Sequence, residues 1–263
     1  MRISDSAISG ALAVCGGLVL ASTAQAAIYD VTINGPDAIW LAGRTDLIIP
    51  PTSSPWPGGL LRHAGNTPEE ALEAIPSFVS VAGGDIVRAL DAAVGGVNFF
   101  NGFGPPFFGP SGNEGAGSSL MAFGGISGYL GPQGPLTGVF LTDAIPSAGP
   151  PATLDFSTPA LRDFASLSPG IGQVFYIGDG KTSGGVFQQF IAPAGATRVF
   201  LAIPDGFGFA GGPGAYDDND GSYRIRIGVN EVPVIAAIPE PETYALMLAG
   251  LGLLGAASRR RRR

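Results

Sequence analysis

The chain has 263 residues and a formal net charge of −7, although five of its 14 basic residues are the arginines that end it. The acidic balance of the preceding residues argues against nucleic acid and anionic membranes as partners, because both repel negative charge. The sequence contains 42 Gly and 23 Pro, which interrupt helices throughout. This composition favours an all-β fold with long Gly- and Pro-rich loops.

The N-terminal segment, residues 1–26, has the pattern of a secretory signal peptide. Met1-Arg2 is followed by a run of small and apolar residues from Ala7 to Ala21. Ala24-Gln25-Ala26 then provides a small-x-small cleavage pattern. The single cysteine, Cys15, lies inside this segment and would leave with it. We therefore expect an exported protein without disulfides, whose stability comes from packing or bound ions.

Short apolar runs bounded by turn-forming residues predict a series of strands across the middle of the chain. In chain order these strands are Ile28–Ile33, Ser77–Val81, Asp85–Leu90, Val94–Phe99, Thr137–Leu141, Thr153–Phe156, Gln173–Ile177, Val186–Ile191, Thr197–Ile203 and Ser222–Ile227. Many short strands separated by turns suggest a β-sandwich. We assign the sandwich to residues 77–232, preceded by an extension of β structure and loops in residues 27–76.

Two segments between these strands are expected to differ from them. Thr67–Ile75 is the one short helix expected outside the C-terminal tail, because it has a Thr cap, a Pro in the first turn and early acidic residues. The Gly- and Pro-rich segment Asn101–Gly134 is expected to form a long excursion between strands.

The densest group of oxygen-bearing side chains is the run Asp217-Asp218-Asn219-Asp220. Together with Asp205 it makes an acidic loop between two expected strands. Calcium takes six to eight oxygen ligands from carboxylates, amides and main-chain carbonyls, so this loop could supply several of them. The same residue types are also typical of a solvent-exposed hairpin turn, and the loop alone leaves both interpretations open. EF-hand spacing is not met, since the twelfth position counted from Tyr216 is Ile227 and not Glu.

Recognisable enzyme chemistry is absent from the sequence. His63 is the only histidine, and no Gly-x-Ser-x-Gly elbow accompanies it. One histidine and no cysteine after the signal peptide cannot form a structural zinc site. Paired carboxylates of the glycosidase type remain a remote alternative, because a sequence does not place two of them across a cleft. We expect a protein that is not an enzyme.

Three features follow one another at the C-terminal end: Pro239-Glu240-Pro241, an apolar stretch over residues 243–258, and the arginines of residues 259–263. The apolar stretch predicts a short transmembrane helix, somewhat below the usual length of about 20 residues. The arginines would keep its end in the cytoplasm. This order resembles the PEP-CTERM sorting signal of Gram-negative bacteria, which we place in residues 233–263.

The sorting-signal resemblance implies a route for the protein. An exosortase would be its partner, after transient anchoring in the inner membrane by the tail. Removal of the tail would then deliver the protein to the cell surface or extracellular matrix. A simple tail anchor is the alternative, because the apolar stretch by itself fits both.

A second resemblance concerns the acidic loop and the Gly-Pro segment Asn101-Gly102-Phe103-Gly104-Pro105. They are similar to the two loops that meet around calcium in the calcium-dependent galactose-specific bacterial lectins, small sandwiches of the galactose-binding-like fold. The resemblance implies a calcium site whose ion coordinates sugar hydroxyls. Its ligands would be the main-chain oxygens of Phe103 and Ala215 and the side chains of Asp205, Asp218 and Asn219.

The sequence departs from the lectin pattern in one feature of the calcium loop and one of the sugar site. The spacing from Asp205 to Ala215 is longer than in these lectins, and their polar His/Gln pair that helps to hold galactose has no counterpart here. A weak calcium–hydroxyl contact would need apolar surface beside it. The candidates for stacking on a sugar are Phe107, Phe108, Phe207 and Phe209, although ordinary packing would also account for them.

The sequence therefore predicts a secreted or surface-sorted, lectin-like protein that binds calcium and associates with extracellular polysaccharide or a galactose-like sugar. The alternative is an extracellular matrix or structural protein without a sugar site. Nucleic acid is not an expected partner, and the membrane is expected to be contacted through the tail alone.

Overall fold

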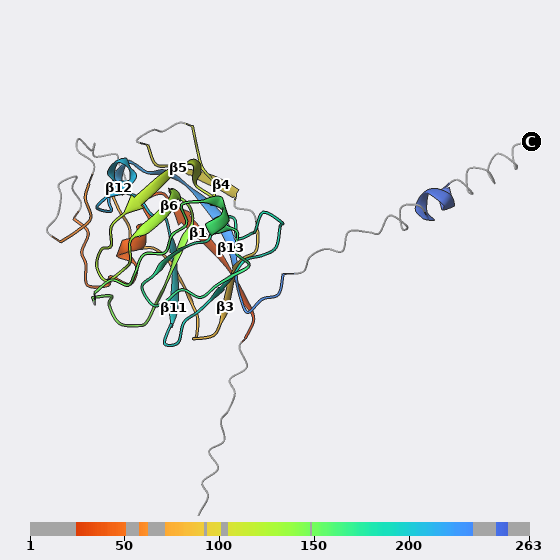
Figure 1. Ribbon diagram of the computed structural model, residues 1–263, viewed down its shortest axis with the longest axis horizontal. Helices are drawn as coiled ribbons and strands as arrows, with labels where there is room; N and C mark the ends of the chain where they lie inside the picture. Colours follow the sequence, from red (N-terminus) through yellow and green to blue (C-terminus); the bar gives the residue numbers. More distant parts are fainter. Residues whose placement is uncertain are drawn as a thin grey trace, which may run out of the picture.

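The computed structural model describes residues 25–50, 58–62, 72–91, 94–100, 105–147, 149–233 and 246–251. Within these ranges the chain is mostly β, with strands in several sheets and a few short helices (Figure 1). The expected all-β class is confirmed at this level. The strands are β1 (Ala27–Asn34), β2 (Phe78–Ser80), β3 (Ile86–Ala89), β4 (Val94–Asn98), β5 (Asn113–Leu120), β6 (Tyr129–Gln133), β7 (Thr137–Leu141), β8 (Ser166–Leu167), β9 (Val174–Tyr176), β10 (Gln189–Ile191), β11 (Arg198–Ala202), β12 (Ala210–Gly211) and β13 (Asp220–Val229).

The strands form three sheets. A six-stranded sheet has the order β1-β13-β3-β10-β8, with β4 also paired to β13. A four-stranded sheet has the order β2-β11-β7-β9, and a three-stranded sheet has the order β12-β5-β6. β1 and β13 pair antiparallel from Ala27 opposite Val229 to Asn34 opposite Ser222. The first strand after the expected signal peptide is thus joined to the last strand before the tail.

The hydrophobic core explains why the alternating segments form strands. In β1, Val31 and Ile33 are buried between exposed neighbours, and in β13 Ile225 and Ile227 alternate with exposed arginines. A period of two places these side chains on one face of the sheet, where they join a single buried cluster with residues of β7 and β11. The fully buried Trp40 belongs to the same cluster, and its Nε1 donates to the Ser127 carbonyl oxygen at 2.9 Å.

The helical elements are short. They are α1 (Pro159–Arg162) and the 3-10 turns η1 (Ile39–Leu41), η2 (Phe207–Phe209) and η3 (Tyr216–Asp218). The helix expected at Thr67–Ile75 is wrong for residues 72–75, and its first part lies outside the described residues. Ala74 is extended and forms a parallel bridge with Asp37, so pairing with the chain after β1 prevails over local helix propensity.

Two strand predictions also need correction. The excursion expected over Asn101–Gly134 contains β5 and β6, which pair antiparallel although their sequences are rich in glycine. Conversely, Thr153–Phe156 forms no strand, and Asp155 makes an isolated bridge with Leu130. In both cases a segment forms a strand or fails to form one according to which other segment lies beside it, as expected for β structure.

The C-terminal region is described in residues 246–251, which are helical. No helix in the described ranges is both long and apolar enough to cross a membrane. Most of the expected span, the Pro239-Glu240-Pro241 motif and residues 1–24 of the expected signal peptide lie outside the described residues.

Candidate functional site

The acidic loop connects two different sheets. β11 belongs to the four-stranded sheet and β13 to the six-stranded sheet, so the loop between them is not a hairpin. On the way it forms η2, then β12, which pairs parallel with β5, and then η3. Asp205, Asp217 and Asn219 are each at most 2% exposed. The interpretation of this stretch as a solvent-exposed turn is therefore wrong.

The main chain of Asp205 is held in place by the loop itself. Its N–H donates to the Tyr216 hydroxyl at 3.1 Å, and that hydroxyl donates to the Ile203 carbonyl oxygen at 2.6 Å. Its carbonyl oxygen accepts from the Gly214 N–H at 3.1 Å. These bonds fix the start of the loop against η3, although ten residues of chain separate them.

The Asp205 side chain is buried with one oxygen unsatisfied. Oδ1 accepts from the Gly206 N–H at 2.7 Å, whereas Oδ2 has no hydrogen-bond partner among the described residues. Burial raises the pKa of this carboxyl well above its usual range, and the carboxylates of Asp218 and Asp217 raise it further. The Gly206 N–H and the nearby Asn219 side chain lower this pKa by less than burial raises it, but by more than either carboxylate does. This position is costly for a lone negative charge and favourable for a proton or a cation.

Asn219 is held by the turn that follows β1. Its Nδ2 donates to the Gly35 carbonyl oxygen at 3.0 Å, and the Gly35 N–H donates to the Gly221 carbonyl oxygen at 3.0 Å. Its Oδ1 has no hydrogen-bond partner in the described part of the chain, and the residue is 2% exposed. Asp205 and Asn219 thus each contribute a buried oxygen that a ligand could satisfy.

Ala215 has a strained backbone at the start of η3. Its φ of 61° and ψ of 19° lie in the left-handed region, which residues other than glycine rarely adopt. Its N–H donates to the Leu61 carbonyl oxygen at 2.8 Å, and its own carbonyl oxygen accepts from the Asp218 N–H at 3.4 Å. Such strain costs about 1–3 kcal/mol and is found most often at functional sites.

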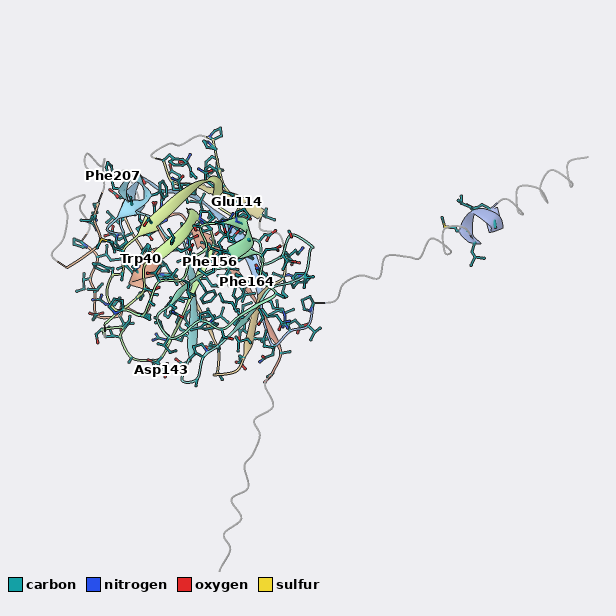
Figure 2. All side chains as sticks on the ribbon, viewed as in Figure 1. Trp40, Glu114, Asp143, Phe156, Phe164 and Phe207 are labelled. Carbon is teal, nitrogen blue, oxygen red and sulfur yellow. The ribbon has the colours of Figure 1, made fainter. Side chains whose placement is uncertain are left out.

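An open pocket of about 350 Å³ brings these residues together with aromatic rings. We call it the acidic pocket. It is lined by Phe99, Phe100, Gln133, Asp205, Gly206, Phe207, Gly208, Phe209, Ala215 and Asp218. The oxygen-bearing side chains and the rings share one concave surface at the upper end of the molecule, where Figure 2 labels Phe207.

The aromatic wall of the acidic pocket differs in part from the expected one. Phe207 and Phe209, two of the four rings expected to contact a sugar, line the pocket, and Phe207 is 67% exposed. Phe108 instead stacks on Phe99, with ring centroids 4.8 Å apart. Phe107 does not line the pocket and packs over β4, where a Cβ on Gly96 would come within 2.9 Å of it.

The structure thus brings Asp205, Ala215 and Asp218 into one pocket, with Asn219 directly beside them in the chain. Phe103 lies outside the described residues. Sequence reasoning missed three residues of the pocket: Phe99 and Phe100, which directly follow β4, and Gln133, which ends β6. The sequence did signal Phe99 and Phe100, because Phe99 ends the strand expected over Val94–Phe99 and Phe100 follows it. It gave no such signal for Gln133.

The pocket is not a ready-made cluster of charged metal ligands. Within the described ranges, no three His, Cys, Asp or Glu side chains are grouped so that they could hold a metal ion. A cation here would therefore depend on amide and main-chain oxygens as well as carboxylates, which is a ligand set suited to hard ions.

The comparisons with known proteins concern the C-terminal end. Residues 237–263 match the family described as the PEP-CTERM protein-sorting motif. No characterised protein and no solved structure shows a significant match to the chain. The chain carries a PEP-CTERM sorting motif, which implies export, exosortase processing and sorting to the cell surface.

Proposed function

We propose that this protein binds calcium in the acidic pocket and, through the ion, the hydroxyl groups of an extracellular carbohydrate. The observation that carries the proposal is the buried Asp205 carboxylate, which lines the pocket and has one oxygen without a hydrogen-bond partner in the described structure. A buried polar group left unsatisfied costs about 1–3 kcal/mol, and more when it is charged. A bound cation would remove that cost.

The donor chemistry favours calcium over other metals. The available atoms are all oxygens: the Asp205 and Asp218 carboxylates, the Asn219 amide and main-chain carbonyls such as that of Ala215. Zinc prefers nitrogen and sulfur, whereas calcium accepts six to eight oxygens in a flexible arrangement. Few charged ligands give a weak site, and extracellular calcium sites function with dissociation constants of about 0.1–1 mM.

The sugar part of the proposal has separate support. An ion in an open pocket keeps coordination positions that two neighbouring hydroxyls can occupy. Phe207 offers an exposed ring beside that position, and rings bury the apolar face of a ligand effectively. The resemblance to calcium-dependent galactose-specific lectins is the reason for choosing a galactose-like sugar and a galactose-binding-like sandwich. The proposal assigns no catalytic step to the pocket.

The test is calcium titration of the exported protein by calorimetry, followed by a glycan array in calcium and in chelator. Asp218→Ala should abolish the calcium signal and the glycan signal together, because it removes a carboxylate from the pocket. Phe207→Ala should leave calcium binding intact and weaken the glycan signal.

The matched control is Asp143→Ala. Asp143 is an exposed acidic residue at the lower end of the molecule, opposite Phe207 (Figure 2). This variant should bind calcium and glycan as the unmodified protein does. Glycan binding that survives chelator would contradict the calcium bridge. Absence of both signals in the unmodified protein would favour a matrix protein without a sugar site.

A further inference from the structure

A second pocket is lined in part by β5, which pairs with β6, the strand that supplies Gln133 to the acidic pocket. It has a volume of about 390 Å³ and is lined on different sides by Glu114, Arg162, Tyr176, Asp179 and Lys181, among others. We call it the arginine pocket. Its volume falls within the range of about 300–1,000 Å³ that is usual for ligand pockets. Neither the sorting motif nor the proposed calcium site accounts for it.

A β-bulge in β5 explains how the arginine pocket is built. Asn113 pairs with Gln133, but the next paired residue, Gly117, is opposite Pro132, so residues 114–116 lie outside the ladder. Bulges re-aim side chains at the edges of sheets and are common beside binding sites. Here the bulge contains Glu114, which forms an ion pair with Arg162 at 3.4 Å.

The Arg162 side chain forms a fixed part of the pocket wall. The residue is 9% exposed, and its Nη1 donates to the Phe156 carbonyl oxygen at 2.8 Å. Its guanidinium lies over the Tyr176 ring, 5.7 Å from the centroid. A buried cation that is held by a main-chain oxygen and a ring needs little reordering when a ligand binds, so the wall is preorganised.

One cross-strand pair connects the linings of the two pockets. Asn113 Nδ2 donates to Gln133 Oε1 at 2.9 Å. Gln133 lines the acidic pocket, and Glu114, directly after Asn113, lines the arginine pocket. Glu114 and Phe207 both lie at the upper end of the molecule in Figure 2. The Asn113–Gln133 hydrogen bond thus connects a residue of the acidic pocket to the neighbour of a residue of the arginine pocket.

The chemistry of the arginine pocket indicates the class of ligand. Arg162 and Lys181 supply donors, Glu114 and Asp179 supply acceptors, and hydroxyl side chains lie among them. A strongly anionic or cationic ligand would meet groups of its own sign. A sugar hydroxyl both donates and accepts, so a neutral polyhydroxylated unit can use both kinds of partner. We propose that the two pockets are subsites of one face that binds an extended neutral polysaccharide chain.

The acidic pocket and the start of the tail lie at opposite ends of the β1–β13 pair. Val229, at the end of β13, lies opposite Ala27, whereas Gly35 and Asn219 meet at the other end of the β1–β13 pair. An eight-residue strand spans roughly 25 Å, so the acidic pocket lies well away from the point where the tail leaves. The arginine pocket lies nearer to that point, because Lys181 contacts the Phe187 ring and Phe187 lines a hollow together with Val232 and Pro233. A polymer outside the cell can therefore reach the acidic pocket first while the tail is anchored.

This inference rests on the proposed function, and the experiment separates the two. The exported protein is titrated in calcium with a disaccharide and a hexasaccharide of linear β-1,4-galactan. The hexasaccharide should bind about tenfold more tightly or better, because its second contact is made within the same complex. Ala160→Trp places a large ring in the arginine pocket from an exposed position of α1. This variant should lose the higher affinity for the hexasaccharide and should bind calcium and the disaccharide as the unmodified protein does.

The matched control is Leu161→Trp, which adds a ring at the next residue of α1, an exposed position that does not line the pocket. This control should still bind the hexasaccharide more tightly than the disaccharide. Equal affinity for the two fragments, or a gain that persists in Ala160→Trp, would overturn the extended face and leave the calcium–sugar proposal standing. Calcium binding without binding of either fragment would overturn the sugar part of the proposed function and the extended face together.

Discussion

Asn219 and Gly35 are 184 residues apart in the chain, yet the Asn219 amide donates a hydrogen bond of 3.0 Å to the Gly35 carbonyl oxygen. The contact joins the end of the acidic loop to the turn after β1. It also holds the Asn219 side chain beside the acidic pocket, with Oδ1 left to accept from or coordinate a ligand. The turn that follows the N-terminal strand thus helps to position a residue of the proposed calcium site.

The first prediction concerns the close approach of these two residues. A Cβ on Gly35 would lie 2.9 Å from Asn219 Cβ and 3.0 Å from its carbonyl carbon. Gly35→Ala should therefore displace Asn219, destabilise the fold by about 1–3 kcal/mol and weaken calcium binding. Gly149→Ala is the control, because no atom of the described residues lies within 4 Å of the added carbon. Denaturant unfolding and calcium calorimetry measure the two effects, and wild-type behaviour of Gly35→Ala in both would show that the contact is unimportant.

The second prediction concerns the strain at Ala215. Because Ala215 is left-handed, replacing it with glycine removes a backbone penalty of about 1–2 kcal/mol and loses a small buried methyl group. Ala210 has φ of −143° in extended backbone, so Ala210→Gly brings only the entropic cost of glycine, about 0.5–1 kcal/mol. In thermal unfolding, Ala215→Gly should be more stable than Ala210→Gly by about 1 kcal/mol. The reverse order would mean that Ala215 is not strained in solution.

The third prediction is a pH dependence that arises at Asp37. Burial raises the pKa of this carboxyl above its usual value of 3.8, despite hydrogen bonds from the Asn34 N–H and amide. The folded protein therefore keeps this proton to higher pH than the unfolded chain does. The corresponding stability is complete below pH 3.8 and is lost as the pH rises through the folded-state pKa.

Asp37→Asn tests this dependence, because asparagine stays neutral and still accepts from the Asn34 N–H. In chelator, the free energy of unfolding of the variant relative to the unmodified protein should increase as the pH rises from 4 towards neutral. Denaturant unfolding at several pH values measures the difference. A difference that does not change with pH would mean that the Asp37 pKa is the same in the folded and unfolded states.

Local patterns allowed much of the β structure to be predicted. β1, β7, β11 and β13 contain alternating or continuous apolar residues, and their signal lies within the strand itself. β5, with the sequence Asn-Glu-Gly-Ala-Gly-Ser-Ser-Leu, carries no such signal. It is a strand because β6 and β12 pair with it. The sequence of one segment alone does not indicate such a pairing with a distant segment.

The candidate site likewise contains residues that the sequence could group and residues that it could not. Asp205, Ala215 and Asp218 lie in one loop, so the sequence could group them before their geometry was known. Gln133 joins them only because the three-stranded sheet packs beside the loop. The burial of Asp217 was also unpredictable, since acidic runs are usually solvated and this one crosses between sheets.

The last prediction concerns calcium and the stability of the whole fold. Ligands that bind the folded state alone stabilise it by mass action, by about 2.7 kcal/mol at a concentration of one hundred times the dissociation constant. The acidic loop connects the two larger sheets and contacts the turn after β1, so stabilising it should raise the temperature of the main unfolding transition and not merely order a surface segment. Differential scanning calorimetry of the exported protein in millimolar calcium should show this rise, and chelator should reverse it. Magnesium should give a smaller rise, because it demands a stricter geometry and loses water reluctantly.

Asp205→Asn keeps the acceptor for the Gly206 N–H but removes the charge that calcium would neutralise, so this variant should melt at the same temperature with and without calcium. An identical shift in Asp205→Asn and in the unmodified protein would place the calcium outside the acidic pocket.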